Sequence, residues 1–191
     1  MKPGRAILIV WLAILTIGMV APFAIHRSLL AELEHLGPAP EFTLTDSNGQ
    51  EFSSAGLANE VWLASFFFAS CPKVCPTVNG RLKRIHEANG HTIRMVSITV
   101  DPARDTPAVL AEQARRYGAD PRRWHFLTGP KEEIRRLIEQ GFGLGADDDP
   151  SLHSTRIALI DRSGSIRGLY QGMDEESVDK LTRDINVLLA R

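Results

Sequence analysis

The sequence predicts an α/β protein in which helices cover both faces of a central mixed sheet. Short apolar segments such as residues 61–68 alternate with segments of helical periodicity. The strand–helix–strand order makes the first central strands parallel, whereas a tight turn at residues 161–164 makes the last two antiparallel. The chain has 191 residues, of which 43% are apolar and 24% charged, so one domain has enough residues for a core of its own.

The elements can be assigned in chain order. Residues 42–46 and 51–53 alternate in polarity about a turn, which predicts a β-hairpin. The later elements are a buried strand at 61–68, a helix at 77–89, a strand at 93–100, a helix at 108–117, a strand at 124–127, a helix at 131–140, strands at 154–160 and 166–170, and an amphipathic helix at 175–189. This order predicts a thioredoxin-like three-layer fold with an N-terminal β-hairpin extension, occupying residues 41–191.

The N-terminus has the pattern of a membrane anchor. Residues 6–25 contain no charged side chain and follow Lys2 and Arg5. About 20 apolar residues span a bilayer as a helix, and the positive-inside rule then exports the rest of the chain. A cleaved signal peptide is the alternative, which the length of the segment and the lack of a small-x-small cleavage site disfavour. We expect a single transmembrane helix in residues 1–27 of an inner (cytoplasmic) membrane, a connector at 28–40, and a domain facing the periplasm or extracytoplasmic side.

Charge and cysteine content argue against a nucleic-acid-binding protein and against a small fold built on a disulfide scaffold. The formal net charge is −1 and no basic block is present, so nothing indicates nucleic-acid binding. The acidic run at residues 147–149 is interpreted as a solvated loop. Cys71 and Cys75 are the only cysteines, and a disulfide between them would close too small a loop to be a structural scaffold. The pair is therefore interpreted as reactive or metal-binding.

Cys71 and Cys75 lie between the strand at 61–68 and the helix at 77–89. The start of a helix favours negative charge and hence the thiolate, which attacks disulfides or binds soft metals. The Cys-x-x-x-Cys spacing is one residue longer than the thioredoxin-type redox motif. In a helix or turn this spacing brings both sulfurs to one side, and Pro76 suits a first helical turn. Two thiolates select Cu(I) or zinc, and they also suit disulfide exchange, so both chemistries stay open.

A third metal ligand is sought among the histidines: His26, His35, His86, His91, His125 and His153. The first two belong to the anchor and connector, and the next three are placed on elements or edges away from the thiols. His153 begins a strand predicted to run antiparallel to the cysteine-bearing strand. Its position therefore lies against the cysteine loop, which predicts His153 as a ligand.

The loop at residues 101–107 is predicted to open at the same edge of the sheet as the cysteines. Its prolines fix the backbone, and Asp105 or Thr106 can cap the helix at 108–117. The same residue types also support metal sites from outside the ligand set or form a partner surface. Both roles are left open.

Three separated segments together resemble the signature of the Sco/SenC family: residues 71–77 (CPKVCPT), residues 100–107 (VDPARDTP), and the pair His153 and Ser154. The resemblance extends from about Pro40 to the C-terminus and includes Trp124 and residues 127–129. It implies a membrane-anchored copper metallochaperone that assists assembly of the dinuclear copper centre in cytochrome c oxidase subunit II. It also implies Cu(I) or Cu(II) as the bound ion, and other copper chaperones or thiol reductants as further partners.

The family's copper ligands fall on Cys71, Cys75 and His153 by this resemblance. Many members have acidic residues where this chain has Lys73 and Leu152, which affects the expected oxidation state of the copper. The alternative function is a thiol–disulfide oxidoreductase that reduces the cysteines of the oxidase copper site, with Cys71 and Cys75 as its catalytic pair. A thiol peroxidase fits less well, because it needs one dedicated low-pKa cysteine with a resolving partner.

Overall fold

A computed structural model describes residues 33–89, 91–143 and 155–190. The chain divides into two units, residues 1–33 and 34–191, and the description below concerns the second. The predicted anchor at residues 6–25 and the acidic run at 147–149 lie outside the described residues. Within the described ranges, no helix is long and apolar enough to cross a membrane.

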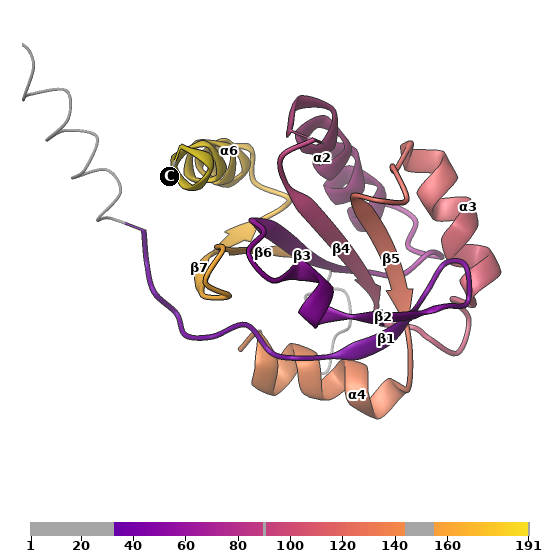
Figure 1. The fold of residues 1–191 in the computed structure, drawn as a ribbon. Helices are drawn as coiled ribbons and strands as arrows, with labels where there is room; N and C mark the ends of the chain where they lie inside the picture. The colour runs from indigo at the N-terminus through magenta and orange to yellow at the C-terminus, as the bar shows by residue number, and fades with distance from the viewer. Residues whose placement is uncertain (1–32, 90, 144–154, 191) are drawn as a thin grey trace, which may run out of the picture. The chain divides into compact units, whose positions relative to one another are not determined.

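The described part of the domain is built on a seven-stranded mixed sheet with helices on both faces (Figure 1). The elements follow one another in this order: β1 (Thr43–Asp46), β2 (Glu51–Ser53), η1 (Ser54–Leu57), β3 (Trp62–Phe67), α2 (Val74–Asn89), β4 (Arg94–Thr99), α3 (Pro107–Tyr117), β5 (Trp124–Thr128), α4 (Lys131–Arg136), η2 (Leu137–Gly141), β6 (Arg156–Ile160), β7 (Ile166–Gln171) and α6 (Glu175–Leu189). The strand order is β2-β1-β5-β4-β3-β6-β7.

Strand directions agree with the sequence-based prediction. β3, β4 and β5 are parallel, whereas β6 runs antiparallel to β3 and β7 antiparallel to β6. The β1–β2 hairpin joins the sheet through β5. Figure 1 shows α2, α3 and α6 on one face and α4 on the other, so the predicted three-layer arrangement with an N-terminal hairpin is confirmed.

Two helix boundaries differ from the prediction, and one element was not predicted. α2 begins at Val74 rather than at residue 77, so its first turn contains Cys75. The helix predicted at residues 131–140 is α-helical only to Arg136 and continues as the π-helical turn η2. The short helix η1 was missed because four residues are too few to show a period.

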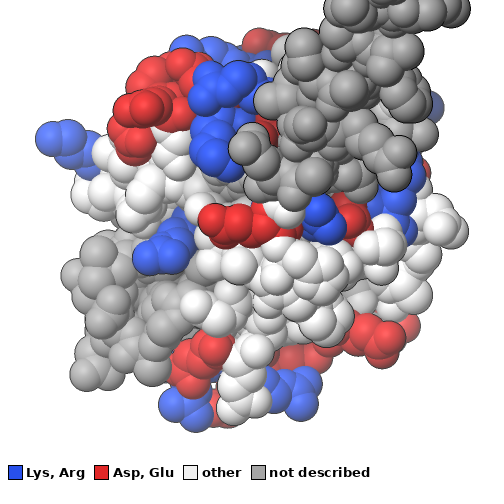
Figure 2. Space-filling view, turned by 90° about the vertical axis from the view of Figure 1, so that its left-hand side faces the viewer, with Lys and Arg blue, Asp and Glu red and all other residues white. Residues whose placement is uncertain are grey.

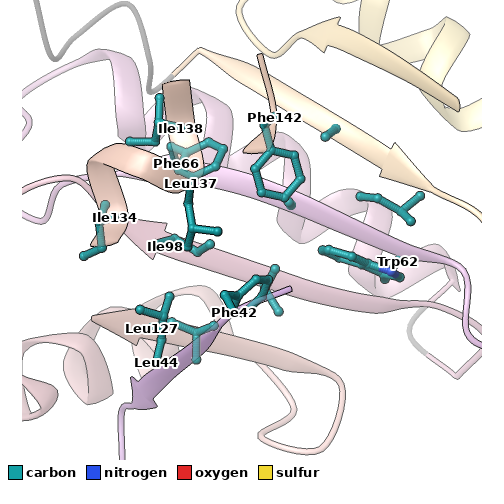
Figure 3. Packing of buried hydrophobic residues seen from close by; sticks show 14 of the residues in the cluster. Phe42, Leu44, Trp62, Phe66, Ile98, Leu127, Ile134, Leu137, Ile138 and Phe142 are labelled. Atoms are coloured by element: carbon teal, nitrogen blue, oxygen red, sulfur yellow. The ribbon is translucent and has the colours of Figure 1, made fainter. Parts of the chain in front are cut away.

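The core on the α4 face is formed by aromatic and aliphatic side chains of the sheet, the hairpin and α4–η2 (Figure 3). Phe142 follows η2 and packs edge-on against Phe66 and Trp62 of β3, with ring centroids 5.5 and 6.4 Å apart. Such edge-to-face aromatic pairs stabilise a core beyond their area burial. The central strand β3, which leads to the cysteines, therefore packs against this core near both of its ends.

The opposite face of β3 is covered by α2 and α3 and contains buried polar links. The Ser65 hydroxyl lies 2.9 Å from the Ser97 hydroxyl on β4, and Trp124 of β5 donates its indole N–H to Ser97 at 2.9 Å. Phe67 packs edge-on against Phe126. Because these links tie β3, β4 and β5 together, they fix the strand ends from which the functional loops emerge.

The surface of the domain carries charges of both signs side by side (Figure 2). On the helices, Arg81 and Arg84 pair with Glu175 at 2.7 and 3.1 Å, and Lys180 pairs with Asp184 at 2.7 Å. Surface pairs of this kind contribute little stability each, but the two pairs with Glu175 join α2 to the first turn of α6.

Candidate functional site

Two loops and the start of β6 meet at one edge of the sheet. β3 and β4 end there in register, with Phe67 opposite Thr99, and antiparallel β6 begins there, with Ser65 opposite Ile157. The predicted meeting of the cysteine loop, the loop at residues 101–107 and the start of β6 is therefore confirmed for the described residues. His153 itself lies outside the described residues, two positions before Thr155, and stays a prediction.

The structure brings Cys71 and Cys75 together. Both cysteines are buried, with 8% and 3% of each residue exposed, and no disulfide joins them in the structure. The Cys75 backbone N–H donates to Cys71 Sγ at 3.2 Å. The sulfur of Cys71 thus accepts from an amide in the first turn of α2, where helical N–H groups have no partner within the helix. Cys75 lies one turn beyond Cys71, which is the geometry that the Cys-x-x-x-Cys spacing predicted.

The environment of Cys71 favours its thiolate. Burial opposes ionisation, but hydrogen bonds from the backbone and side chain of Cys75 and from the amides of Lys73 and Val74 outweigh it and lower the pKa of Cys71 below its ordinary value. A thiolate is the species that binds soft metals and attacks disulfides. The lowered pKa of Cys71 therefore favours either chemistry.

Asp105 ties the cysteine loop to the neighbouring loop. Its carboxylate is 2% exposed and accepts hydrogen bonds from the Ala69 backbone N–H at 2.9 Å and from the Thr99 hydroxyl. Thr99 in turn accepts from the backbone N–H of Asp101. Thr106, not Asp105, caps α3, since its hydroxyl accepts from Val109 N–H. Of the two roles considered for this loop, Thr106 performs the capping and Asp105 supports the cysteine loop.

The other histidines in the domain lie away from the thiols, as predicted. His91 is exposed before β4, at the opposite edge of the sheet. The His86 ring is buried on α2 and accepts from the Asp120 backbone N–H at 3.3 Å. His125 lies on β5 against Phe52, with ring centroids 4.5 Å apart. All three have structural surroundings remote from the cysteine edge.

Comparison with known proteins identifies the family. The SCO1/SenC family model matches residues 32–190, nearly the whole of the described domain. The chain belongs to the SCO1/SenC family. An SCO1 protein homolog from Bacillus subtilis is 28% identical over 152 residues, covering 75% of this chain and 79% of that protein. An SCO2-like protein from Rickettsia felis is 37% identical over 136 residues, and the chain spans 64% of its length.

Solved structures include a metal-bound member of this family. The structure of Bradyrhizobium japonicum ScoI with copper bound is 26% identical to this chain, with a TM-score of 0.57, and the match covers 77% of this chain and 99% of that one. The resemblance that three short segments indicated is thus confirmed at the level of the family and the fold.

Proposed function

We propose that this SCO1/SenC protein is a membrane-anchored copper metallochaperone that binds one copper ion through Cys71, Cys75 and His153. The observation that supports it most strongly is the pair of buried thiols linked through the Cys75 N–H to Cys71 Sγ. Two adjacent thiolates are soft donors that prefer copper(I) to hard cations. Membership of a family that contains a copper-bound ScoI agrees with this choice of metal.

His153 completes the ligand set in this proposal. Thr155 lies at the cysteine edge, where its carbonyl accepts from Gly172 N–H, and Gly172 adjoins Val78 of α2. His153 lies two residues before Thr155 in the sequence, which supports a role for it at this edge. An imidazole added to two thiolates gives the three-donor set that also accommodates copper(II).

Copper titration of the full chain in detergent micelles tests the ligand set. The wild type should bind about one copper ion per chain and show a thiolate-to-copper(II) absorption band. His153→Ala should lose most of this band, and Cys71→Ser should lose it completely. His91→Ala is the matched control, because His91 is exposed at the opposite edge, and it should behave as the wild type. A band unchanged in His153→Ala removes that histidine from the site.

The recipient in this proposal is the dinuclear copper centre of cytochrome c oxidase subunit II. Residues 1–27 would hold the domain on the periplasmic or extracytoplasmic side of the inner membrane, where that centre is assembled. Copper-loaded full chain mixed with the metal-free subunit II domain should lose its ion to that domain, observed by the absorption of the recipient. Protease added to intact spheroplasts should cleave the domain, and protection from cleavage would contradict the orientation.

A thiol–disulfide oxidoreductase is the second candidate. The lowered pKa of Cys71 and the closeness of Cys75 suit reduction of a partner disulfide as well as metal binding. Insulin reduction separates the two functions. Turnover that is independent of His153 supports the reductase, whereas copper binding that requires His153 supports the metallochaperone.

A further inference from the structure

Lys73 is the only charged residue between the two cysteines. Its side chain is exposed, and its backbone amide contributes to stabilising the sulfur of Cys71. The structure gives Lys73 no ion pair among the described residues. A cationic side chain thus stands within a few residues of both thiols without a described counter-charge.

The two described carboxylates in the loop next to the cysteine loop are already paired. Asp105 is buried and already accepts from Ala69 and Thr99. Asp101 pairs with Arg104, with 3.6 Å between Oδ2 and Nε. Arg156, at the start of β6, adds a second exposed cation. Lys73 and Arg156 are therefore two exposed cations on the described rim of the thiol pair.

We propose that Lys73 biases this site towards copper(I) over copper(II). The inference rests on the proposed copper-binding function and follows from the charges of the two complexes. Two thiolates and a neutral imidazole give a net charge of zero with copper(II) and of −1 with copper(I). A nearby cation stabilises the anionic complex and leaves the neutral one almost unaffected. The sign is the same if the imidazole is not a ligand.

The size of the effect follows from Coulomb's law. A charge about 10 Å from the ion, with an effective dielectric constant of about 50 for a site near the surface, changes the ratio of the two affinities about three-fold. Neutralising Lys73 should lower the ratio of copper(I) to copper(II) affinity by about that factor, and reversing its charge by about ten-fold.

The test compares the wild-type full chain in detergent micelles with Lys73→Met and Lys73→Glu. Affinities for copper(I), measured anaerobically, and for copper(II) are determined by competition with chromophoric chelators. Lys83→Glu is the matched control, because Lys83 lies on the same helix, about 12 Å beyond Cys75 at 1.5 Å per residue. Its affinity ratio should change clearly less than that of Lys73→Glu, since the interaction weakens with distance and solvent ions screen charges over about 8–10 Å.

Salt distinguishes an electrostatic role of Lys73 from a structural one. In about 1 M salt the screening length falls to about 3 Å, so the differences between the Lys73 variants should largely disappear. An affinity ratio in Lys73→Glu equal to that of the wild type at low salt overturns the inference and leaves the proposed function intact. A wild type that binds neither ion overturns both. A difference that persists at high salt also overturns the inference, because it assigns the effect to altered structure.

Discussion

A buried aspartate holds a loop in place at each of the two edges where the strands begin and end. The two aspartates do so in different ways. Asp161, at the turn between β6 and β7, accepts from the backbone N–H groups of Ser163 and Ser165 at 2.8 and 3.1 Å, all within five residues. Asp105 accepts instead from Ala69, 36 residues earlier in the chain, and from Thr99. The bonds of Asp161, including its ion pair with Arg167 at 3.6 Å, stay within the β6–β7 hairpin, whereas the cysteine loop depends on a second loop for its position.

Replacing the two aspartates should give the largest contrast. Asp105→Ala leaves the Ala69 amide and the Thr99 hydroxyl without an acceptor, so it should lower the free energy of unfolding by about 3 kcal/mol. Because the cysteine loop is released at its start, copper(I) affinity should fall about ten-fold, by the cost of re-ordering a loosened site on binding. Urea unfolding of the metal-free chain and chelator competition measure the two quantities.

Asp161→Ala is the control for this prediction. It should cost about 2 kcal/mol of stability, since its hydrogen bonds to the turn are only partly buried and water can replace the carboxylate there, and leave copper affinity within about two-fold. Asp105→Asn keeps an acceptor in place and should recover most of the loss. Equal copper affinities in Asp105→Ala and Asp161→Ala would show that Asp105 does not position the site.

The same contrast explains how much the sequence predicted. The turn at Asp161 was predictable because its hydrogen bonds are local and Gly164 has a positive φ of 78°, which glycine adopts freely. The edge at which the cysteines and the loop at residues 101–107 meet was predictable from strand direction alone. The hydrogen bond between Asp105 and Ala69 was not predictable from the sequence. Asp105 could equally have capped the next helix or supported the cysteine loop, and both roles were chemically reasonable.

The start of α2 was also misplaced, for a physical reason. The prediction began the helix at residue 77, after Pro76, although proline is tolerated throughout the first turn, where N–H groups have no helical acceptor. The structure begins the helix at Val74 and uses Cys71 Sγ as an acceptor for the Cys75 N–H. Sulfur acceptors are absent from the usual helix-cap residue types, so no sequence signal marked this boundary. The three proposed copper ligands, Cys71, Cys75 and His153, remain predictions.

A smaller difference in stability and in copper spectrum is expected between alanine substitutions at two glycines. A Cβ on Gly172, at the cysteine edge, would lie 2.8 Å from Val78 Cγ1 and 2.9 Å from the Thr155 carbonyl oxygen. Gly172→Ala should therefore shift the backbone at Thr155, cost about 2 kcal/mol, and weaken the thiolate-to-copper(II) band by displacing the segment that carries His153. Unfolding and copper(II) spectra check the two effects.

Gly164→Ala provides the comparison at the other edge. A Cβ there would meet nothing within 4 Å, so the substitution costs only the strain of a positive φ, about 1 kcal/mol. The copper spectrum should not change. A spectrum altered by Gly164→Ala as much as by Gly172→Ala would mean that the two edges are not independent.

The smallest expected effect is a loss of stability in acid, and it concerns the edge of the sheet opposite the proposed copper site. Burial lowers the pKa of His86, although nearby Asp120 and Glu87 act in the opposite direction. The unfolded chain therefore takes up this proton more readily than the folded one, so stability is lost as pH falls below about 6.5, the ordinary histidine pKa. The neutral ring accepts from the Asp120 N–H, and protonation removes that acceptor.

His86→Gln isolates this contribution. Glutamine keeps an acceptor but does not titrate. The free energies of unfolding at about pH 7.5 and about pH 5.5 should therefore differ less in the variant than in the wild type. The reduction should be a fraction of the ~1.4 kcal/mol per pH unit that one fully linked proton gives. At neutral pH, the copper(I) affinity of the variant should equal that of the wild type, because His86 belongs to the edge opposite the thiols. The same pH dependence in both proteins would assign the acid sensitivity to another group. A changed copper affinity would show instead that α2 transmits strain from its C-terminal turns to Cys75.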